Sequence, residues 1–179
     1  MTYAVTSVAL PSPSLVERSL EPCHYFDAFS LHAARGTFGD VDALARASSQ
    51  LPRWIGALMA VRNGIVRRFG LKTEPAEPPD TANASAIVPG VAVGIFLVLA
   101  RSDDEILMGL DDRHLDFRFS LALQQQADGE RAVASTTVRF NNAWGRLYFA
   151  IVKPFHKLII PALLRAAMSR VDRVAVPHV

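Results

Sequence analysis

Alternation of apolar and polar residues dominates the middle of the chain and predicts an antiparallel sheet. Runs rich in β-branched and aromatic residues are separated by turn signals such as Asp128-Gly129, a pattern typical of strands joined by hairpins. Successive side chains of a strand point to opposite faces. The predicted strands are Val91 to Ala100, Glu105 to Leu110, His114 to Gln124 and Arg131 to Phe140.

The two faces of this predicted sheet differ in polarity, most clearly in the run from His114 to Gln124. The apolar positions of that run are Leu115, Phe117, Phe119, Leu121 and Leu123, and the opposite positions are His114, Asp116, Arg118 and Ser120. We therefore expect one face to cover a core and the other face to be polar.

The chain before the sheet combines a weak strand pattern with a helical period. We predict a first strand between Ser19 and Ala34, and two helices between Asp40 and Leu71, with Asp40 as the N-cap of the first helix. Residues 1–18 are expected to be disordered. Residues 72–90, rich in Pro, Ala, Asp and Glu, are expected to form a mobile loop, either an insertion or a lid over a pocket.

One long apolar helix is predicted after the sheet. Asn141-Asn142 is a capping pair, and Pro154 and Pro161 should bend the helix because each removes a backbone hydrogen bond. Residues 172–179 are expected to form a tail. The element order predicts one α+β domain over residues 1–179 with a helix-grip arrangement, in which a curved antiparallel sheet wraps around the C-terminal helix and two helices follow the first strand.

Charge and composition narrow the function classes. The 19 basic and 17 acidic side chains leave a net charge of +2, too small for a dedicated nucleic-acid-binding surface. Cys23 is the only cysteine, which excludes internal disulfides and a cysteine-ligated zinc site. Met1 to Leu15 lacks a signal-peptide pattern, so a cytoplasmic location is expected. Lys153 and Lys157 interrupt the most apolar stretch, Leu147 to Leu164, which predicts a buried or interfacial helix and no transmembrane segment.

The sharpest candidate chemistry lies between Asp111 and Arg118. If His114, Asp116 and Arg118 share a strand face, they stand roughly 6.5 to 7 Å apart, and a carboxylate can hydrogen-bond its neighbours. Asp116 orienting His114 would give a general base for catalysis near neutral pH. The structural alternative, which we favour, is an ion-pair ladder that includes Arg139 on the neighbouring strand.

Other polar and aromatic residues are candidates for contact with a ligand rather than for catalysis. Each of them can also be explained as a core, capping or surface residue without any ligand, because cavity-lining and core side chains are of the same types. The ligand-binding candidates are Trp54, Arg118, Arg139, Asn142, Tyr148 and His156.

A metal site would combine His114 with nearby aspartates and with His156. Histidine and carboxylate ligands suit zinc or iron. A single histidine among acidic residues on a strand is more often paired with them than bound to a metal. We therefore predict no metal and no cofactor.

Two stretches resemble an uncharacterised bacterial family known only as a domain of unknown function. They are GLDDRHLDFRFSL (Gly109 to Leu121) and TTVRFNNAWGRLYFAIVKPFHKLIIPALL (Thr136 to Leu164), and DDRHLDFR is the most specific string. The resemblance extends from Trp54 onward. The family pattern is filled here by Asn142, Gly145, Arg146, Tyr148, Pro154, Phe155 and His156.

The resemblance implies a START-like fold, similar to the START and birch-pollen-allergen superfamily, whose members usually hold an apolar ligand between sheet and helix. It implies no reaction. Relatives also occur joined to nicotinamide-dependent Rossmann domains, but this chain has no such domain and no GxGxxG motif.

Three functions stay open. The first, which we favour, is a non-enzymatic domain that binds a small apolar or amphipathic molecule between the sheet and the C-terminal helix. The second is an acid–base enzyme of lyase, cyclase or hydrolase type that uses His114 and Asp116. The third is a structural or interaction module, either a homodimer through the open sheet edge or the partner of an oxidoreductase.

Overall fold

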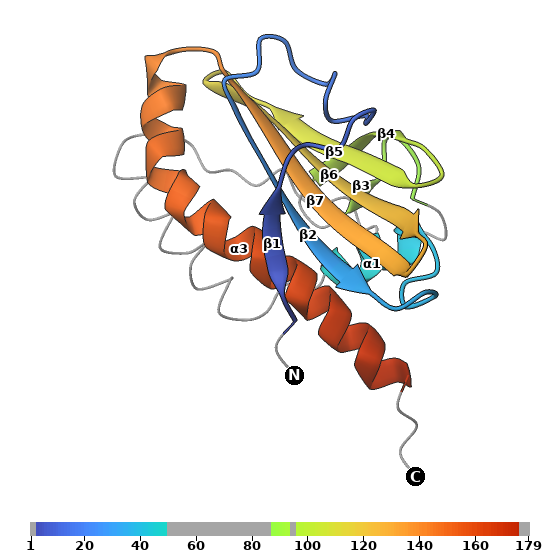
Figure 1. The fold of residues 1–179 in the computed structure, drawn as a ribbon. Helices are drawn as coiled ribbons and strands as arrows, with labels where there is room; N and C mark the ends of the chain where they lie inside the picture. The colour runs from blue at the N-terminus through green and yellow to red at the C-terminus, as the bar shows by residue number, and fades with distance from the viewer. Residues whose placement is uncertain (1–2, 50–86, 94–95, 176–179) are drawn as a thin grey trace.

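An antiparallel sheet of seven strands and one long helix form most of the described structure (Figure 1). The computed structural model describes residues 3–49, 87–93 and 96–175. The strand order is β1-β2-β7-β6-β5-β4-β3. The strands are β1 (Val5–Val8), β2 (Tyr25–Ala33), β3 (Ala92–Val93), β4 (Phe96–Arg101), β5 (Glu105–Asp111), β6 (Leu115–Gln126) and β7 (Gly129–Phe140), and the helices are α1 (Val41–Ser49) and α3 (Ala143–Ala175).

The long strands β6 and β7 carry the centre of the sheet because their alternation continues without a break. They pair from Leu115 opposite Phe140 to Gln126 opposite Gly129. This register puts the apolar residues of both strands on one face, which α3 crosses diagonally (Figure 1). The predicted turn at Asp128-Gly129 is confirmed, since β7 begins at Gly129.

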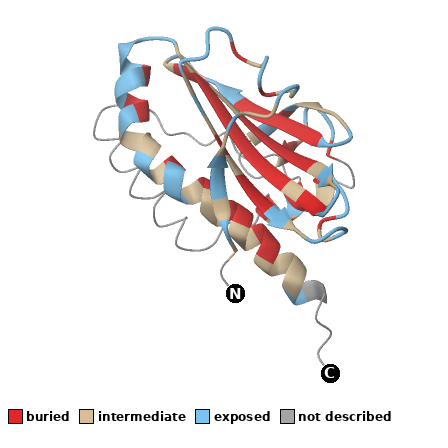
Figure 2. Cartoon of the chain, viewed as in Figure 1, coloured by how far each residue is buried: buried red, intermediate tan, exposed pale blue. Residues whose placement is uncertain are grey.

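The main core lies between α3 and this apolar face of the sheet, which is called the concave face below. Phe119 and Leu121 of β6 belong to one buried cluster with Ile160 and Leu164 of α3. Figure 2 shows the buried residues concentrated on the sheet and on the side of α3 that faces it. Each such side chain contributes about 1.5–3 kcal/mol relative to full exposure, so this interface holds the helix on the sheet.

The predicted α+β, helix-grip-like architecture is therefore confirmed. Asp40 caps α1 as predicted, because the Ala43 backbone N–H donates to Asp40 Oδ1 over 2.7 Å. The second predicted helix, within residues 52–69, lies outside the described residues. The same is true of residues 72–86 of the predicted loop. Helix α3 bends in its N-terminal half (Figure 1), where Pro154 lies, as expected from the missing backbone hydrogen bond.

Besides shifts at several strand ends, three larger differences from the sequence predictions concern β1, the strand predicted from Val91 to Ala100, and the end of α3. Residues 5–8 form β1 rather than disordered chain, and so short a strand leaves too few residues for a detectable period. The single strand predicted from Val91 to Ala100 is divided into β3 and β4, which pair with each other. The tail predicted from residue 172 begins later, because α3 continues to Ala175.

The second face of the sheet is covered by the crossing segment, which we define as residues 9–24. Glu105 of β5 anchors it: the Leu15 N–H donates to Glu105 Oε2 over 2.7 Å and the Val16 N–H to Glu105 Oε1 over 3.3 Å. The Ser120 hydroxyl donates to the same carboxylate over 2.6 Å. The polar face predicted from the alternation is thus largely a buried, hydrogen-bonded layer.

Candidate functional site

Strand β2 places two polar side chains on the apolar face that meets α3. Tyr25 and Asp27 share a face with Phe29 and Leu31, since all four stand at odd positions of the strand. In the sheet register Asp27 lies opposite Thr136 of β7. A carboxyl group at this position needs partners, because burying an unpaired charge is costly.

Helix α3 supplies the partner through His156. His156 Nε2 lies 3.1 Å from Asp27 Oδ1, and the Tyr25 hydroxyl donates to Asp27 Oδ2 over 2.6 Å. The side chains of His156 and Asp27 are only 8% and 11% exposed. Tyr25, Asp27 and His156 are called the concave cluster below.

Aromatic rings surround the concave cluster. The ring of His156 meets Phe117 of β6 edge-on, with ring centroids 6.4 Å apart. Tyr25 packs against Phe149 of α3 at 4.6 Å, and Lys153 Nζ lies 4.8 Å from the Tyr25 ring centre. The cluster is therefore a polar group within an apolar interface, with one cation at its border.

The surroundings fix the charge of Asp27 at neutral pH. Burial alone would raise the pKa of the Asp27 carboxyl, but the hydrogen bonds and positive charge of His156, with the hydroxyl of Tyr25, outweigh it and hold this pKa below its ordinary value. Burial, and then the neighbouring Asp27, raise the pKa of the Tyr25 hydroxyl. At neutral pH Asp27 is ionised and Tyr25 is protonated.

This charge state determines what His156 can do. An ionised carboxylate only accepts hydrogen bonds, so His156 Nε2 carries the proton that faces Asp27. The opposite ring nitrogen, Nδ1, is an acceptor when the imidazole is neutral and a donor when it is protonated. The Asp27–His156 pair can hold a ligand hydroxyl or exchange a proton with it.

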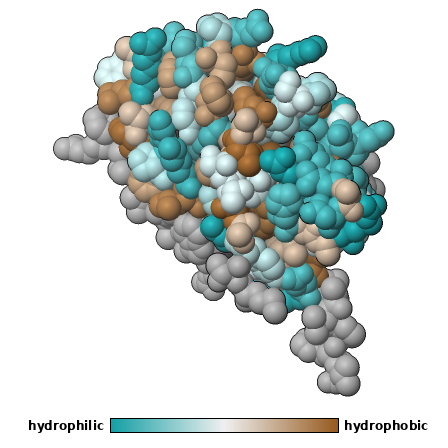
Figure 3. Space-filling model, viewed as in Figure 1, coloured by the Kyte–Doolittle hydropathy of each residue, from teal (hydrophilic) through white to brown (hydrophobic). Residues whose placement is uncertain are grey.

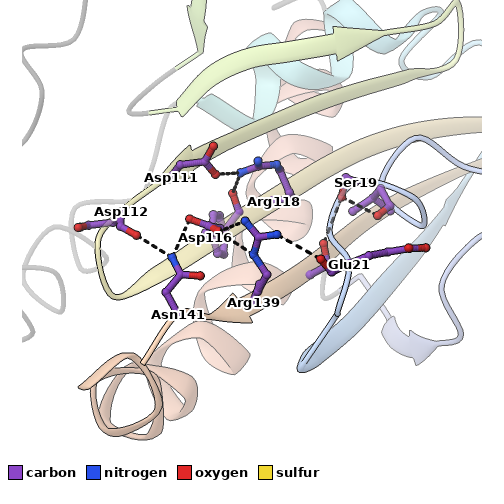
Figure 4. Close-up of polar contacts among 11 residues, drawn as sticks. Ser19, Glu21, Asp111, Asp112, Asp116, Arg118, Arg139 and Asn141 are labelled. Carbon is purple, nitrogen blue, oxygen red and sulfur yellow. Dashed lines mark hydrogen bonds and ion pairs between the residues drawn. The ribbon is translucent and has the colours of Figure 1, made fainter. Parts of the chain in front are cut away.

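A second set of charged groups lies on the opposite face of the sheet (Figure 4). Arg139 of β7 donates from Nε (2.8 Å) and Nη2 (2.5 Å) to Asp116 Oδ2, and from Nη1 to the carbonyl of Glu21 in the crossing segment (3.2 Å). Asn141 Nδ2 donates to Asp116 Oδ1 over 3.1 Å. Arg118 pairs with Asp111 on β5. These are the cross-strand ion pairs of the ladder interpretation.

The structure does not bring His114 and Asp116 into a hydrogen bond with each other. His114 precedes β6 rather than lying within it, and its Nδ1 is 3.2 Å from Asp112 Oδ1. The ring of His114 also meets Tyr148 edge-on at 5.1 Å. Asp116 is engaged by Arg139 and Asn141, which hold its pKa below the ordinary value against the opposing effect of burial.

The remaining predicted ligand contacts have varied surroundings. Asn142 caps α3, because its Oδ1 accepts from the Gly145 N–H over 3.0 Å. Tyr148 is buried in a small apolar cluster with Leu115 and Val138. Trp54 lies outside the described residues.

Within the described ranges, no group of three or more histidine, cysteine or acidic side chains is placed to hold a metal ion. His114 and His156 each pair with a different aspartate, Asp112 and Asp27.

Sequence reasoning missed Tyr25 and Asp27. The available signal was two polar residues, Tyr25 and Asp27, on the same strand side as the apolar Phe29 and Leu31. That signal does not identify His156 as the partner of Asp27. Asp27 and His156 are 129 positions apart, and only the packing of α3 on the sheet brings them together.

Comparison with known proteins adds a family and no activity. Residues 19–163 match the family described as "Protein of unknown function (DUF2867)". No match is found among curated proteins or among solved structures.

Proposed function

The chain belongs to the protein family of unknown function DUF2867, and from this premise we propose that it binds a small apolar or amphipathic molecule between the concave face of the sheet and α3. The proposal extends the START-like resemblance of the sequence to its usual use, an apolar ligand held between sheet and helix. A cytoplasmic location belongs to the same proposal, and the free, exposed thiol of Cys23 is in keeping with a reducing compartment.

The concave cluster is the observation that carries the proposal. Packing of α3 on the sheet needs only apolar contacts, and a buried ion pair is often no more stabilising than apolar residues of similar volume. Ligand sites, in contrast, combine an apolar lining with a few placed polar groups. The ring of Phe117 meets His156 and the ring of Phe149 packs on Tyr25, so the concave cluster with its Asp27–His156 hydrogen bond has that composition.

The chemistry of the concave cluster indicates the polar end of the ligand. His156 Nδ1 can accept from a hydroxyl, and Lys153 Nζ beside the Tyr25 ring can donate to a carbonyl or carboxylate. An amphipathic molecule with a hydroxyl, carbonyl or carboxylate head and an apolar body meets both groups.

One observation favours a second candidate function, acid–base catalysis. Asp27 orients the imidazole of His156 in the way a carboxylate orients a catalytic histidine. The catalytic hypothesis therefore moves from His114 and Asp116, which have separate partners, to the Asp27–His156 pair.

Native mass spectrometry of protein purified from its own host tests the binding proposal. We expect an additional bound mass of small-molecule size in the wild type and its loss in His156→Asn. Two variants should keep it: His114→Asn, the competing site, and His32→Asn, which changes an exposed histidine on β2.

Titration with 1-anilinonaphthalene-8-sulfonate, an aromatic anion, gives an independent measurement. The wild type should show one saturable site that His156→Asn weakens, while circular dichroism shows an unchanged fold. Absence of both a co-purified mass and a saturable site would contradict the binding proposal. Loss of the bound mass in His114→Asn but not in His156→Asn would place the ligand site at His114 instead of at the concave cluster.

A further inference from the structure

The N-terminal half of α3, Ala143 to Leu158, presents large apolar side chains to solvent. Trp144 is 56% exposed, Leu147 45% and Leu158 59%. Figure 2 shows the exposed positions of α3 concentrated in this half. Three such side chains on one helix are not explained by the core, which α3 contacts mainly through its later residues such as Ile160 and Leu164.

The exposed side chains are ordered around the helix axis. Leu147 and Leu158 are eleven positions apart, about three helical turns, so they project in nearly the same direction, with Trp144 beside them. Arg146 and Lys157 have the same spacing and project from the adjacent flank. Figure 3 shows hydrophobic and hydrophilic side chains side by side along this edge of the molecule. The exposed face therefore has an apolar flank and a basic flank.

The charge of α3 has one sign over nearly its whole length. From Ala143 to Val171 the helix carries five basic and no acidic residues, and Asp172 is its first acid. The basic residues of this stretch are Arg146, Lys153, Lys157, Arg165 and Arg170. An anionic partner would meet no repulsive carboxylate on this helix before Asp172.

The apolar character of the helix is sufficient for a lipid environment. By length and composition α3 could cross a bilayer, but its inner side packs on the sheet, and it is the core helix of the domain. Only 33% of an apolar 18-residue stretch of this helix is buried. A helix with one side on a core and an apolar, basic outer side is suited to lie in a membrane interface rather than to span it.

We propose that the exposed face of Ala143 to Leu158 docks on the surface of an anionic lipid bilayer. Trp144, Leu147 and Leu158 enter the interface, where tryptophan is favoured, and Arg146 and Lys157 meet the lipid phosphates. A lipid surface accounts for both flanks: it offers apolar depth and distributed negative charge along a helix. The proposal is independent of ligand binding, because none of these residues belongs to the concave cluster.

Co-sedimentation with vesicles tests the proposal. Wild-type protein should bind vesicles of phosphatidylcholine with phosphatidylglycerol at least tenfold more tightly than vesicles of phosphatidylcholine alone, and sodium chloride should weaken the binding. Arg146→Glu with Lys157→Glu should reduce the affinity more than tenfold, since each cation near an anionic surface contributes roughly fivefold. Trp144→Ser with Leu158→Ser should reduce it by a similar factor.

Matched variants elsewhere on the surface separate this face from general charge and hydrophobicity. Arg18→Glu changes an exposed cation of the crossing segment, and Phe26→Ser changes a 60% exposed aromatic residue on β2. Both should bind the vesicles as the wild type does. In a Trp54→Phe background the emission of Trp144 should shift to shorter wavelength when anionic vesicles are added.

Three results would overturn the proposal. One is equal binding to the two kinds of vesicle, or none. Another is wild-type binding by the Arg146→Glu/Lys157→Glu variant. The third is a stable dimer in solution that Trp144→Ser with Leu158→Ser converts to a monomer, because a second copy of the chain would then occupy the face.

Discussion

At the residue scale, Asp111 and Asp116 differ strongly in burial although both belong to the DDRHLDFR motif. Asp116 is 3% exposed, and its carboxylate has three hydrogen bonds from Arg139 and Asn141. Asp111, which pairs with Arg118, is 66% exposed. We therefore expect these two aspartates of one sequence motif to contribute very differently to the free energy of unfolding.

Asp116→Ala should lower the free energy of unfolding by about 1–3 kcal/mol, because it removes a buried carboxylate that accepts three hydrogen bonds from Arg139 and Asn141. Denaturant unfolding measures the change. The control Asp111→Ala should change stability by less than about 1 kcal/mol, since the Asp111 carboxylate is largely solvated and an ion pair with one exposed partner contributes little. Equal effects of the two variants would mean that burial does not distinguish them.

The concave cluster makes a prediction about pH. The folded-state pKa of Asp27 is below its ordinary value, so the ionised carboxylate stabilises the fold above its unfolded pKa of about 3.9. This contribution is lost as the pH falls through the lowered folded pKa. Asp27→Asn should therefore be less stable than the wild type at neutral pH, and the difference should shrink in strong acid.

Urea unfolding of wild type and Asp27→Asn at a series of pH values measures that difference. Comparing the two proteins at each pH removes the contributions of Asp116 and Glu130, whose pKa values are also lowered. A difference that stays constant from neutral pH to well below pH 3.9 would contradict an ionised Asp27 in the folded state.

At the element scale, the start of α3 is fixed by backbone contact with the turn before β6. A Cβ atom on Gly145 would lie 1.9 Å from the carbonyl oxygen of His114. Only glycine permits this approach, and it brings the helix N-terminus against the strand ends. The same contact explains why Asn142, the N-cap, also donates from Nδ2 to the Arg113 carbonyl.

The sign of the change in unfolding free energy of Gly145→Ala tests this contact. Helix propensity alone predicts stabilisation by about 1 kcal/mol, whereas the contact with a backbone oxygen predicts destabilisation by about 1–3 kcal/mol. We expect destabilisation in thermal or denaturant unfolding. Ala150→Gly, at an exposed position of the same helix, is the control and should cost only the propensity, about 1 kcal/mol. A more stable Gly145→Ala protein would show that the helix start can move freely.

At the scale of the whole molecule, β1 joins the N-terminus to both the sheet and α3. Val5 to Val8 pair with Leu31 to Ala28 of β2. Arg165 of α3 donates to the carbonyl of Tyr3 over 3.2 Å, and the Tyr3 hydroxyl donates to Asp172. These few residues cover the edge of β2 and tie it to the helix.

Deletion of residues 1–9 should destabilise the protein and promote self-association, because it leaves the hydrogen-bonding edge of β2 unpaired. Light scattering after size exclusion measures the association. Deletion of Met1 and Thr2 alone keeps β1 and should leave the mass and stability unchanged. If the protein without residues 1–9 is monomeric and equally stable, β1 does not protect the edge of β2 from self-association.

The central part of the fold could be predicted from the sequence, and the candidate site only in part. The alternation from His114 to Phe140 determined the long strands, their turn and the apolar face, because strand periodicity is a local property. Strand β1 has too few residues to show a period. The ladder partners Asp116 and Arg139 were predictable because they lie at matched positions of a hairpin.

The sequence by itself determined the α+β class, the apolar C-terminal helix and the charged strand face. Tertiary structure alone decided that His156 pairs with Asp27 and that His114 pairs with Asp112 rather than Asp116. The physical reason is range: a period along one element follows from backbone geometry, whereas a contact between β2 and α3 depends on how the helix crosses the sheet. The hydrogen bond between Asp27 and His156 belongs to the second kind of contact.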